Sequence, residues 1–120
     1  MNPEEFKKRT KAFAIRVIQP VEALPRSRAG NVIGGQLLRC GTSVGANCRA
    51  ACRARSSADF AAKMGIVEEE CDESAYWTEL LIEARIVKES RLSALLNETN
   101  EILSMVVASI RTSRKKSEIM

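Results

Sequence analysis

Histidine is absent from this chain of 120 residues, and aromatic residues make up only 4% of it. Without histidine the chain lacks the side chain that most often acts as an acid or base at neutral pH, and also the commonest metal ligand. Because the chain has no histidine, it can form neither a Ser–His nor a Cys–His pair, and it has no phosphate-cradling GxxxxGKS or GxxxxGKT loop. We therefore expect no catalytic residues, no enzyme activity and no cofactor.

Long apolar runs are missing as well. The longest uncharged runs, such as Ile102 to Ile110, fall far short of the ~20 residues that a membrane-spanning helix needs. The first five residues, Met-Asn-Pro-Glu-Glu, lack the basic-then-apolar order of an export signal. We expect a soluble cytoplasmic protein with reduced thiols and no membrane partner.

Four cysteines are present, but none forms a CxxC pair. Cys48 and Cys52 are spaced to share one helix face, and Cys71 could join them in a thiolate metal site. Structural zinc sites favour CxxC pairs and histidine, whereas an isolated cysteine usually packs as a small buried hydrophobe. We therefore predict that the thiols pack in the core and that the chain has no metal site.

Charge is distributed unevenly along the chain. Residues 1–55 hold eleven Lys/Arg and three Asp/Glu, whereas residues 56–108 hold four and eleven. The net charge of +4 therefore conceals a segment of +8 followed by one of −7. Such a division indicates either a basic surface for a polyanion or basic and acidic helices that attract each other.

Apolar residues recur at three- and four-residue intervals in four segments, as amphipathic helices require. Residues suited to cap a helix start precede these segments: Asn2, Ser27 or Asn31, Ser56 and Ser90. The pattern predicts helices over residues 3–24, 29–54, 57–86 and 91–114, and a basic, frayed tail within 111–120. Short loops between such helices predict an all-α, antiparallel up-down-up-down four-helix bundle of one domain, residues 1–120.

Pro20 interrupts the first predicted helix. Inside a helix, proline removes one hydrogen bond and clashes with the carbonyl of Arg16, at a cost of ~3 kcal/mol. Because the apolar period continues to Leu24, we predict a kink before Pro20 rather than the end of the helix.

A stripe of polar residues marks the second predicted helix. Arg39, Ser43 and Asn47 recur every four residues and therefore lie in one row. Gly41 and Gly45 share this spacing beside them, so neighbouring helices can approach closely.

Two interpretations of this polar stripe remain open. In the structural one, Arg39 reaches a carboxylate of the third helix, either Glu70 or Glu73, in a buried network that a lost partner would weaken by ~3–5 kcal/mol. In the functional interpretation, Arg39 and Asn47 bind phosphate groups or nucleic-acid bases. The small residues beside the stripe favour the structural interpretation.

Other basic residues are better candidates for contact with a polyanion. They collect on the first helix and at the end of the second: Lys7, Lys8, Lys11, Arg16, Arg49, Arg53 and Arg55. The alternative to polyanion contact is that each of these side chains belongs to an ordinary solvent-exposed helix face.

Three dispersed motifs lie between residues 37 and 77. They are Leu37-Leu38-Arg39-x-x-x-Ser43-Val44-x-Ala46-Asn47, Ser56-x-x-x-Phe60-x-x-Lys63-Met64 and Glu70-x-x-Glu73-x-x-Tyr76-Trp77. From Phe6 to Ile110 the sequence resembles the small four-helix bundle proteins encoded in intervening sequences of bacterial 23S ribosomal RNA. That family includes the accessory variability determinant of diversity-generating retroelements.

The resemblance implies a homopentamer of four-helix bundles arranged as a barrel. It also implies, for the accessory variability branch, a basic surface that binds nucleic acid and a reverse transcriptase. The chain departs from the family pattern after Asn47. Many members continue with a hydrophobic residue and Ala-Glu-Gly, whereas this chain has Cys48-Arg49-Ala50-Ala51, which makes the surface more basic.

We therefore predict a ring-like homo-oligomer, a pentamer, that binds nucleic acid without catalysis; RNA is the favoured nucleic acid and DNA the alternative. A nucleic-acid-handling protein is a further candidate partner. The alternative function is a protein-interaction scaffold whose basic faces pair with acidic faces of neighbouring copies.

Overall fold

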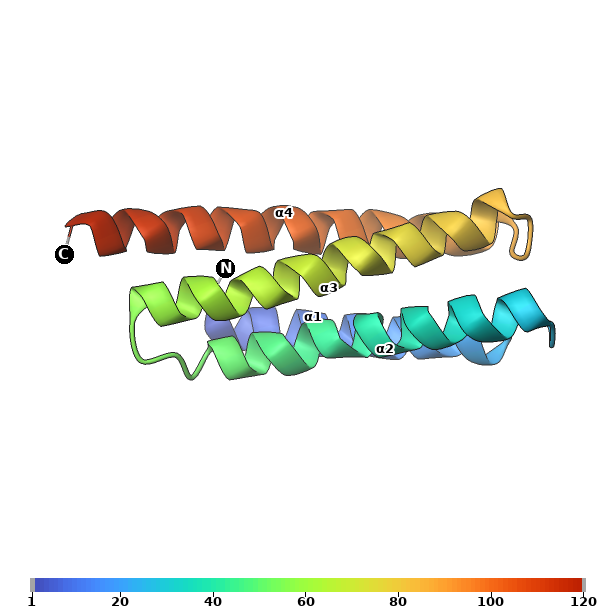
Figure 1. Cartoon of the computed structure of the whole chain (residues 1–120), viewed down its shortest axis with the longest axis horizontal. Coiled ribbons are helices and arrows are strands. Elements are labelled where there is room, and N and C mark those ends of the chain that lie inside the picture. The colour runs from blue at the N-terminus through green and yellow to red at the C-terminus, as the bar shows by residue number, and fades with distance from the viewer. Residues whose placement is uncertain (1, 120) are drawn as a thin grey trace.

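Four α-helices account for nearly all of the described chain. The computed structural model describes residues 2–119, with side chains as far as Glu118. The helices are α1 (Pro3–Glu22), α2 (Arg28–Ala51), α3 (Ser57–Glu83) and α4 (Glu89–Ile119), and residues 2–119 contain no strand. They lie along the long axis of a rod of 52 × 22 × 20 Å, and the chain turns back at each connection (Figure 1). The prediction of an all-α chain with four helices is confirmed.

Three of the predicted helix caps are present. The side-chain oxygens of Asn2, Ser27 and Ser56 accept hydrogen bonds from backbone N–H groups three residues later, at 2.8, 2.9 and 3.0 Å. Each bond satisfies a donor that the first helical turn leaves unpaired. The prediction for Ser90 is wrong, because α4 begins one residue before it, at Glu89.

Helix α1 continues through Pro20 and ends at Glu22. The prediction that Pro20 does not end the helix is confirmed, although the helix stops two residues before Leu24. Helix α2 likewise ends at Ala51 rather than at residue 54, and tighter turn-type hydrogen bonds follow it.

Helix α3 ends at Glu83, three residues before its predicted end, because Arg85 adopts a left-handed conformation with φ 60°. The N–H of Ile86 then bonds to the carbonyl of Leu81, and that of Arg85 to the carbonyl of Ile82, both at 3.0 Å. This is the Schellman arrangement that closes many helices, usually with glycine in the place of Arg85.

Helix α4 corrects the largest error of the sequence interpretation. The prediction of a helix over 91–114 and a frayed basic tail is wrong, because α4 runs without a break to Ile119. Residues 89–119 contain neither glycine nor proline, so nothing in the sequence ends the helix. The hydroxyl of Ser113, which is buried, also donates to the carbonyl of Ser57 in α3 at 2.6 Å. Figure 1 shows the end of α4 extending past the other helices.

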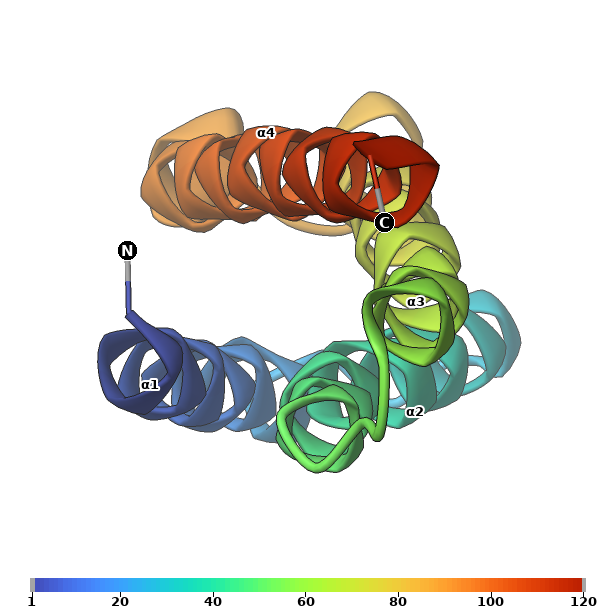
Figure 2. The same ribbon diagram turned by 90° about the vertical axis from the view of Figure 1, so that its left-hand side faces the viewer.

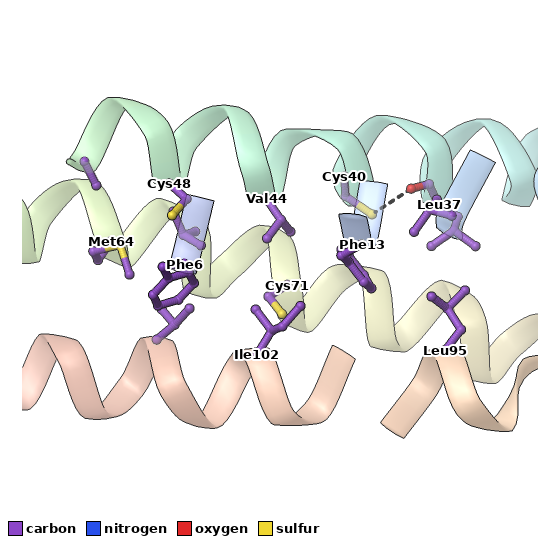
Figure 3. Packing of buried hydrophobic residues seen from close by; sticks show 14 of the residues in the cluster. Phe6, Phe13, Leu37, Cys40, Val44, Cys48, Met64, Cys71, Leu95 and Ile102 are labelled. Atoms are coloured by element: carbon purple, nitrogen blue, oxygen red, sulfur yellow. Dashed lines mark hydrogen bonds between the residues drawn. The ribbon is translucent and has the colours of Figure 1, made fainter. Parts of the chain in front are cut away.

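The core is built from aliphatic and sulfur-containing side chains of all four helices, with few aromatic rings (Figure 3). Each helix contributes residues from one face: Phe6 and Phe13 from α1, Leu37, Val44 and Cys48 from α2, Met64 and Cys71 from α3, and Leu95 and Ile102 from α4.

None of the helices within residues 2–119 is long and apolar enough to cross a membrane.

The thiols of Cys40, Cys48 and Cys71 are buried in this core. Burial raises the pKa of Cys48 to about 11 and the pKa of Cys71 to about 12, so both remain protonated at neutral pH. The thiol of Cys71 donates to the carbonyl of Thr99 in α4 at 3.3 Å. Over residues 2–119, His, Cys, Asp and Glu side chains do not gather in groups of three or more that could hold a metal ion.

Helices α1 and α2 approach closely where α2 carries glycine. A Cβ atom on Gly41 would lie 2.9 Å from both Cγ atoms of Val17, and one on Gly45 would lie 3.2 Å from the carbonyl oxygen of Thr10. Both distances are shorter than ordinary van der Waals contact. The small-residue face predicted for the second helix therefore packs against α1.

Helices α1 and α4 approach each other over a shorter stretch than the helix pairs that follow one another in the chain. An ion pair spans this contact. Arg9 donates from Nε to one carboxylate oxygen of Glu98 at 2.9 Å and from Nη2 to the other at 2.6 Å, and Glu101 lies at 3.5 Å. The Glu98 side chain is only 16% exposed, so water screens this bidentate ion pair poorly.

The close contact at Gly41 predicts the effect of adding one methyl group. Val17 is fully buried and stiff at χ1, so Gly41→Ala forces α1 away and should lower the free energy of unfolding by about 1–3 kcal/mol. Gly35→Ala is the matched control, because nothing lies within 4 Å of its added Cβ, and alanine there should stabilise α2 by about 0.5–1 kcal/mol. Urea denaturation measures both; equal effects of the two variants would contradict the close packing.

The Arg9–Glu98 pair predicts a dependence of stability on pH. The hydrogen bond from Arg9 holds the pKa of Glu98 below its usual value of 4.5, so the pair stabilises the fold at neutral pH and this stabilisation is lost as the pH falls below 4.5. Arg9→Met should lower the free energy of unfolding by about 1.5–3 kcal/mol at neutral pH and by much less in acid.

Lys7→Met is the control, because Lys7 pairs with Glu4, whose side chain is 82% exposed, and such pairs contribute about 0–1 kcal/mol. Urea denaturation at pH 7 and at pH 3 distinguishes the two variants. A loss for Arg9→Met that is as large at pH 3 as at pH 7 would show that the ion pair is not its cause.

Candidate nucleic-acid interface

The polar stripe of α2 lies at the surface, where Arg39 joins α2 to α3. Its guanidinium donates to Glu70 at 3.2 Å and also to Glu73, and half of the Arg39 side chain is exposed. Ser43 and Asn47 do not extend this contact between helices. Each donates to a backbone carbonyl of α2 four residues earlier, Ser43 to Arg39 at 2.7 Å and Asn47 to Ser43 at 2.9 Å. The interpretation of the stripe as a buried network is therefore wrong on one point: the network is not buried, because the Arg39 side chain is half-exposed.

Glu73 is also held by a second donor. The indole N–H of Trp77 donates to the same carboxylate oxygen at 3.2 Å, and this bond, together with the bond from Arg39, lowers the pKa of Glu73. The charge of Arg39 is thus matched by two carboxylates of α3. This geometry leaves the stripe with little net positive charge to offer a phosphate.

Basic side chains gather at one end of the rod. The start of α1, the end of α2, the α2–α3 connection and the end of α4 all lie toward this end (Figure 1), and the end-on view in Figure 2 shows the start of α1 beside α2 and the end of α4 above α3. These segments carry the residues that we call the basic end: Lys7, Lys8, Arg49, Arg53, Arg55, Arg111, Arg114, Lys115 and Lys116. Nearly all of these side chains are exposed.

Five of the seven predicted basic residues thus lie in segments at this end of the rod. Lys11 and Arg16 lie farther along α1, and Arg16 is nine residues beyond Lys7, or about 14 Å at 1.5 Å per residue. Arg16 also lies close enough to Glu98 to lower the pKa of that carboxyl. Arg16 therefore lies apart from the others, whereas Lys11 is about one helical turn beyond Lys7 on the same face of α1.

Within residues 2–118 the arginines of the basic end have no ion-paired carboxylate, although Arg55 lies near enough to Asp59 to help lower the pKa of that carboxyl. Among residues 2–118, the side chains of Arg49, Arg53 and Arg55 form no ion pair. The nearby carboxylate of Asp59 bonds to Lys63 at 3.0 Å and to the backbone N–H of Arg55 at 3.2 Å, and the bond from Lys63 lowers the pKa of Asp59. Lys7 differs from the arginines, because it pairs with Glu4 at 2.8 Å.

Sequence reasoning missed the contribution of α4 to this surface. It ended the helix at residue 114 and left Lys115 and Lys116 in a frayed tail, although the lack of glycine and proline between residues 89 and 119 was a signal that the helix continues. Because α4 remains helical, its last turns reach the end of the rod where α2 stops. Four more cations therefore join the arginines of the α2–α3 connection.

A hollow of about 660 Å³ opens at the basic end, between the start of α1, the α2–α3 connection and the last turns of α4. Phe6, Phe60 and Met105 supply apolar surface, and Arg55 and Lys116 supply positive charge. The arrangement combines cations with a concave apolar surface and suits a ligand that has both an anionic and a flat apolar part.

Comparison with known proteins agrees with the predicted family. Residues 4–108 match the family model described as 23S rRNA-intervening sequence protein. The crystal structure of a protein with unknown function from the S23 ribosomal protein family of Bacteroides thetaiotaomicron is similar, with a TM-score of 0.81 and 34% identity over 88% of this chain and 97% of that chain. No curated protein matches the chain significantly. The chain therefore belongs to the 23S rRNA-intervening sequence protein family.

Proposed function

We propose that this protein binds RNA without catalysis and holds the RNA phosphates at the basic end. The observation that carries the proposal is the convergence there of cations from α1, α2 and α4, including three arginines with no ion pair among residues 2–118. Arginine and lysine side chains that neutralise phosphates release condensed counterions, which favours binding. Guanidinium and ammonium groups bind phosphate by charge and hydrogen bonds, and this role needs no bond to be broken.

The choice of RNA over DNA rests on the family. The matching model is named for an intervening sequence of 23S ribosomal RNA, and the similar crystal structure belongs to a family named for a ribosomal protein. Phosphate contacts alone do not distinguish the two nucleic acids, because that distinction needs contacts to the 2′-hydroxyl or to unpaired bases.

We further propose that the chain acts in the cytoplasm as a ring-like homopentamer of antiparallel bundles. Exposed large apolar side chains support self-association: Ile15 and Ile18 on α1, Val32 on α2, and Ile66 and Tyr76 on α3. Apolar groups left on a surface often mark protein interfaces. A ring would present several basic ends to one RNA, or to a protein that handles nucleic acid, and would raise the overall affinity through multivalency.

A second candidate function is a protein-interaction scaffold. Exposed carboxylates on α3 include Glu69, which is three residues from the exposed apolar side chain of Ile66 and therefore on a neighbouring part of the helix face, and Asp72 in the following turn. The basic end of one copy could pair with this acidic face of the next. In that case the arginines would hold the oligomer together rather than bind RNA.

A charge-reversal pair separates the two functions. Arg53→Glu with Arg55→Glu removes two phosphate contacts and adds repulsion, so the affinity for single-stranded RNA should fall at least about tenfold at low salt. The slope of log affinity against log salt should become shallower by about 1.4, or about 0.7 per lost contact. Fluorescence anisotropy across a salt series measures both quantities.

Arg26→Glu with Arg28→Glu is the matched control. It makes the same change in net charge at the opposite end of α2, where both side chains are exposed, and should change the affinity far less. Light scattering of the same variants tests the scaffold. If the reversal at Arg53 and Arg55 breaks the oligomer while RNA affinity is unchanged, the scaffold is correct and the RNA proposal fails.

A further inference from the structure

The side chains that line the hollow at the basic end are of three chemical kinds: aromatic rings, hydroxyl groups and positively charged groups. Phe60, which is partly exposed, contributes an aromatic ring to its apolar surface, and Phe6, which is only 6% exposed, also borders the hollow. Ser109 and Thr112 of α4 add hydroxyl groups that can donate and accept hydrogen bonds. Arg55 and Lys116 place positive charge on two different elements, the α2–α3 connection and the end of α4.

The wall formed by α4 is fixed rather than loose. Ser113, buried among its neighbours, donates its hydroxyl to the carbonyl of Ser57 in the first turn of α3 at 2.6 Å. This bond ties the last turns of α4 to the start of α3. The residues of this wall beyond Ala108 lie outside the stretch 4–108 that the family model matches, so the hollow is partly a feature of this chain's own C-terminal segment.

We propose that this hollow takes up an unpaired nucleotide of the bound RNA, so that the protein prefers single-stranded RNA to duplex RNA. The inference rests on the proposed RNA-binding function and names the form of RNA that this function uses. The base lies against the aromatic and apolar surface, and the hydroxyl groups of Ser109 and Thr112 bond to its edge. The flanking phosphates bind Arg55 and Lys116.

The size and chemistry of the hollow support this occupant. Small-ligand sites occupy about 300–1,000 Å³ and combine apolar walls with a few polar groups, and the hollow's volume of about 660 Å³ falls within that range. Single-stranded RNA is recognised mainly through unstacked bases that lie on aromatic side chains beside a basic path for the backbone. A duplex keeps its bases stacked and paired, so it can use only the phosphate contacts.

A steric block in the hollow tests the inference without changing charge. Ala108 lines the hollow and is exposed, so Ala108→Phe fills space there without disturbing the core. The probes are a fluorescein-labelled single-stranded RNA of about twelve nucleotides and the duplex formed with its complement. The unmodified protein should bind the single strand about tenfold more tightly than the duplex. Ala108→Phe should weaken single-strand binding about tenfold and leave duplex binding nearly unchanged.

Ala94→Phe is the matched control, because Ala94 is also exposed on α4 but lies fourteen residues away, or about 21 Å along the helix. It should change neither affinity. Thr112→Phe provides a second block within the hollow in case Ala108→Phe does not fold.

Three results would overturn the inference. One is equal affinity of the unmodified protein for single strand and duplex, which leaves the RNA-binding function intact. Another is a block that alters the oligomer mass in light scattering without reducing single-strand affinity, because the hollow would then be a contact between copies. The last is no binding of either RNA at low salt, which also defeats the proposed function.

Discussion

The arrangement of this protein depends on how closely α1 can lie against α2. Gly41 and Gly45 remove the side chains that would hold the two helices apart, so Val17 and the backbone at Thr10 come into contact with α2. With α1 in this position, its start lies beside the end of α2. Arg9, on the same helix, reaches Glu98 on α4 and so links the first helix to the last. The close contact between α1 and α2 thus determines both how the core packs and which segments lie beside the basic end.

The second requirement is the length of α4. A helix that ended at residue 114 in a frayed tail would leave Lys115 and Lys116 outside the fold, and the hollow would lose part of one wall. The hydrogen bond from Ser113 to the first turn of α3 instead holds the last turns of α4 in place. The contacts that hold the helices together therefore lie in the middle of the rod, and the surface that we propose for ligand binding lies at one end.

Sequence reasoning succeeded where the signal is local or periodic. Capping by Asn2, Ser27 and Ser56 follows from residue type and spacing, and the apolar period predicted the four helices, whereas the family was identified by the resemblance of its motifs. It failed where two distant segments must be placed together. The Arg9–Glu98 pair spans 89 residues and the Ser113 bond spans 56, and neither has a local pattern. The hollow was missed for the same reason, because three separate segments form it.

The central claim is that RNA binds at the basic end and not along the rest of the rod. Backbone amide chemical shifts, followed by nuclear magnetic resonance as single-stranded RNA is added, test this claim residue by residue. If RNA binds at the basic end, the largest shifts fall in residues 53–60 and 108–116, with little change in residues 83–91 at the opposite end. Shifts spread evenly over the rod, or concentrated in residues 83–91, would contradict it.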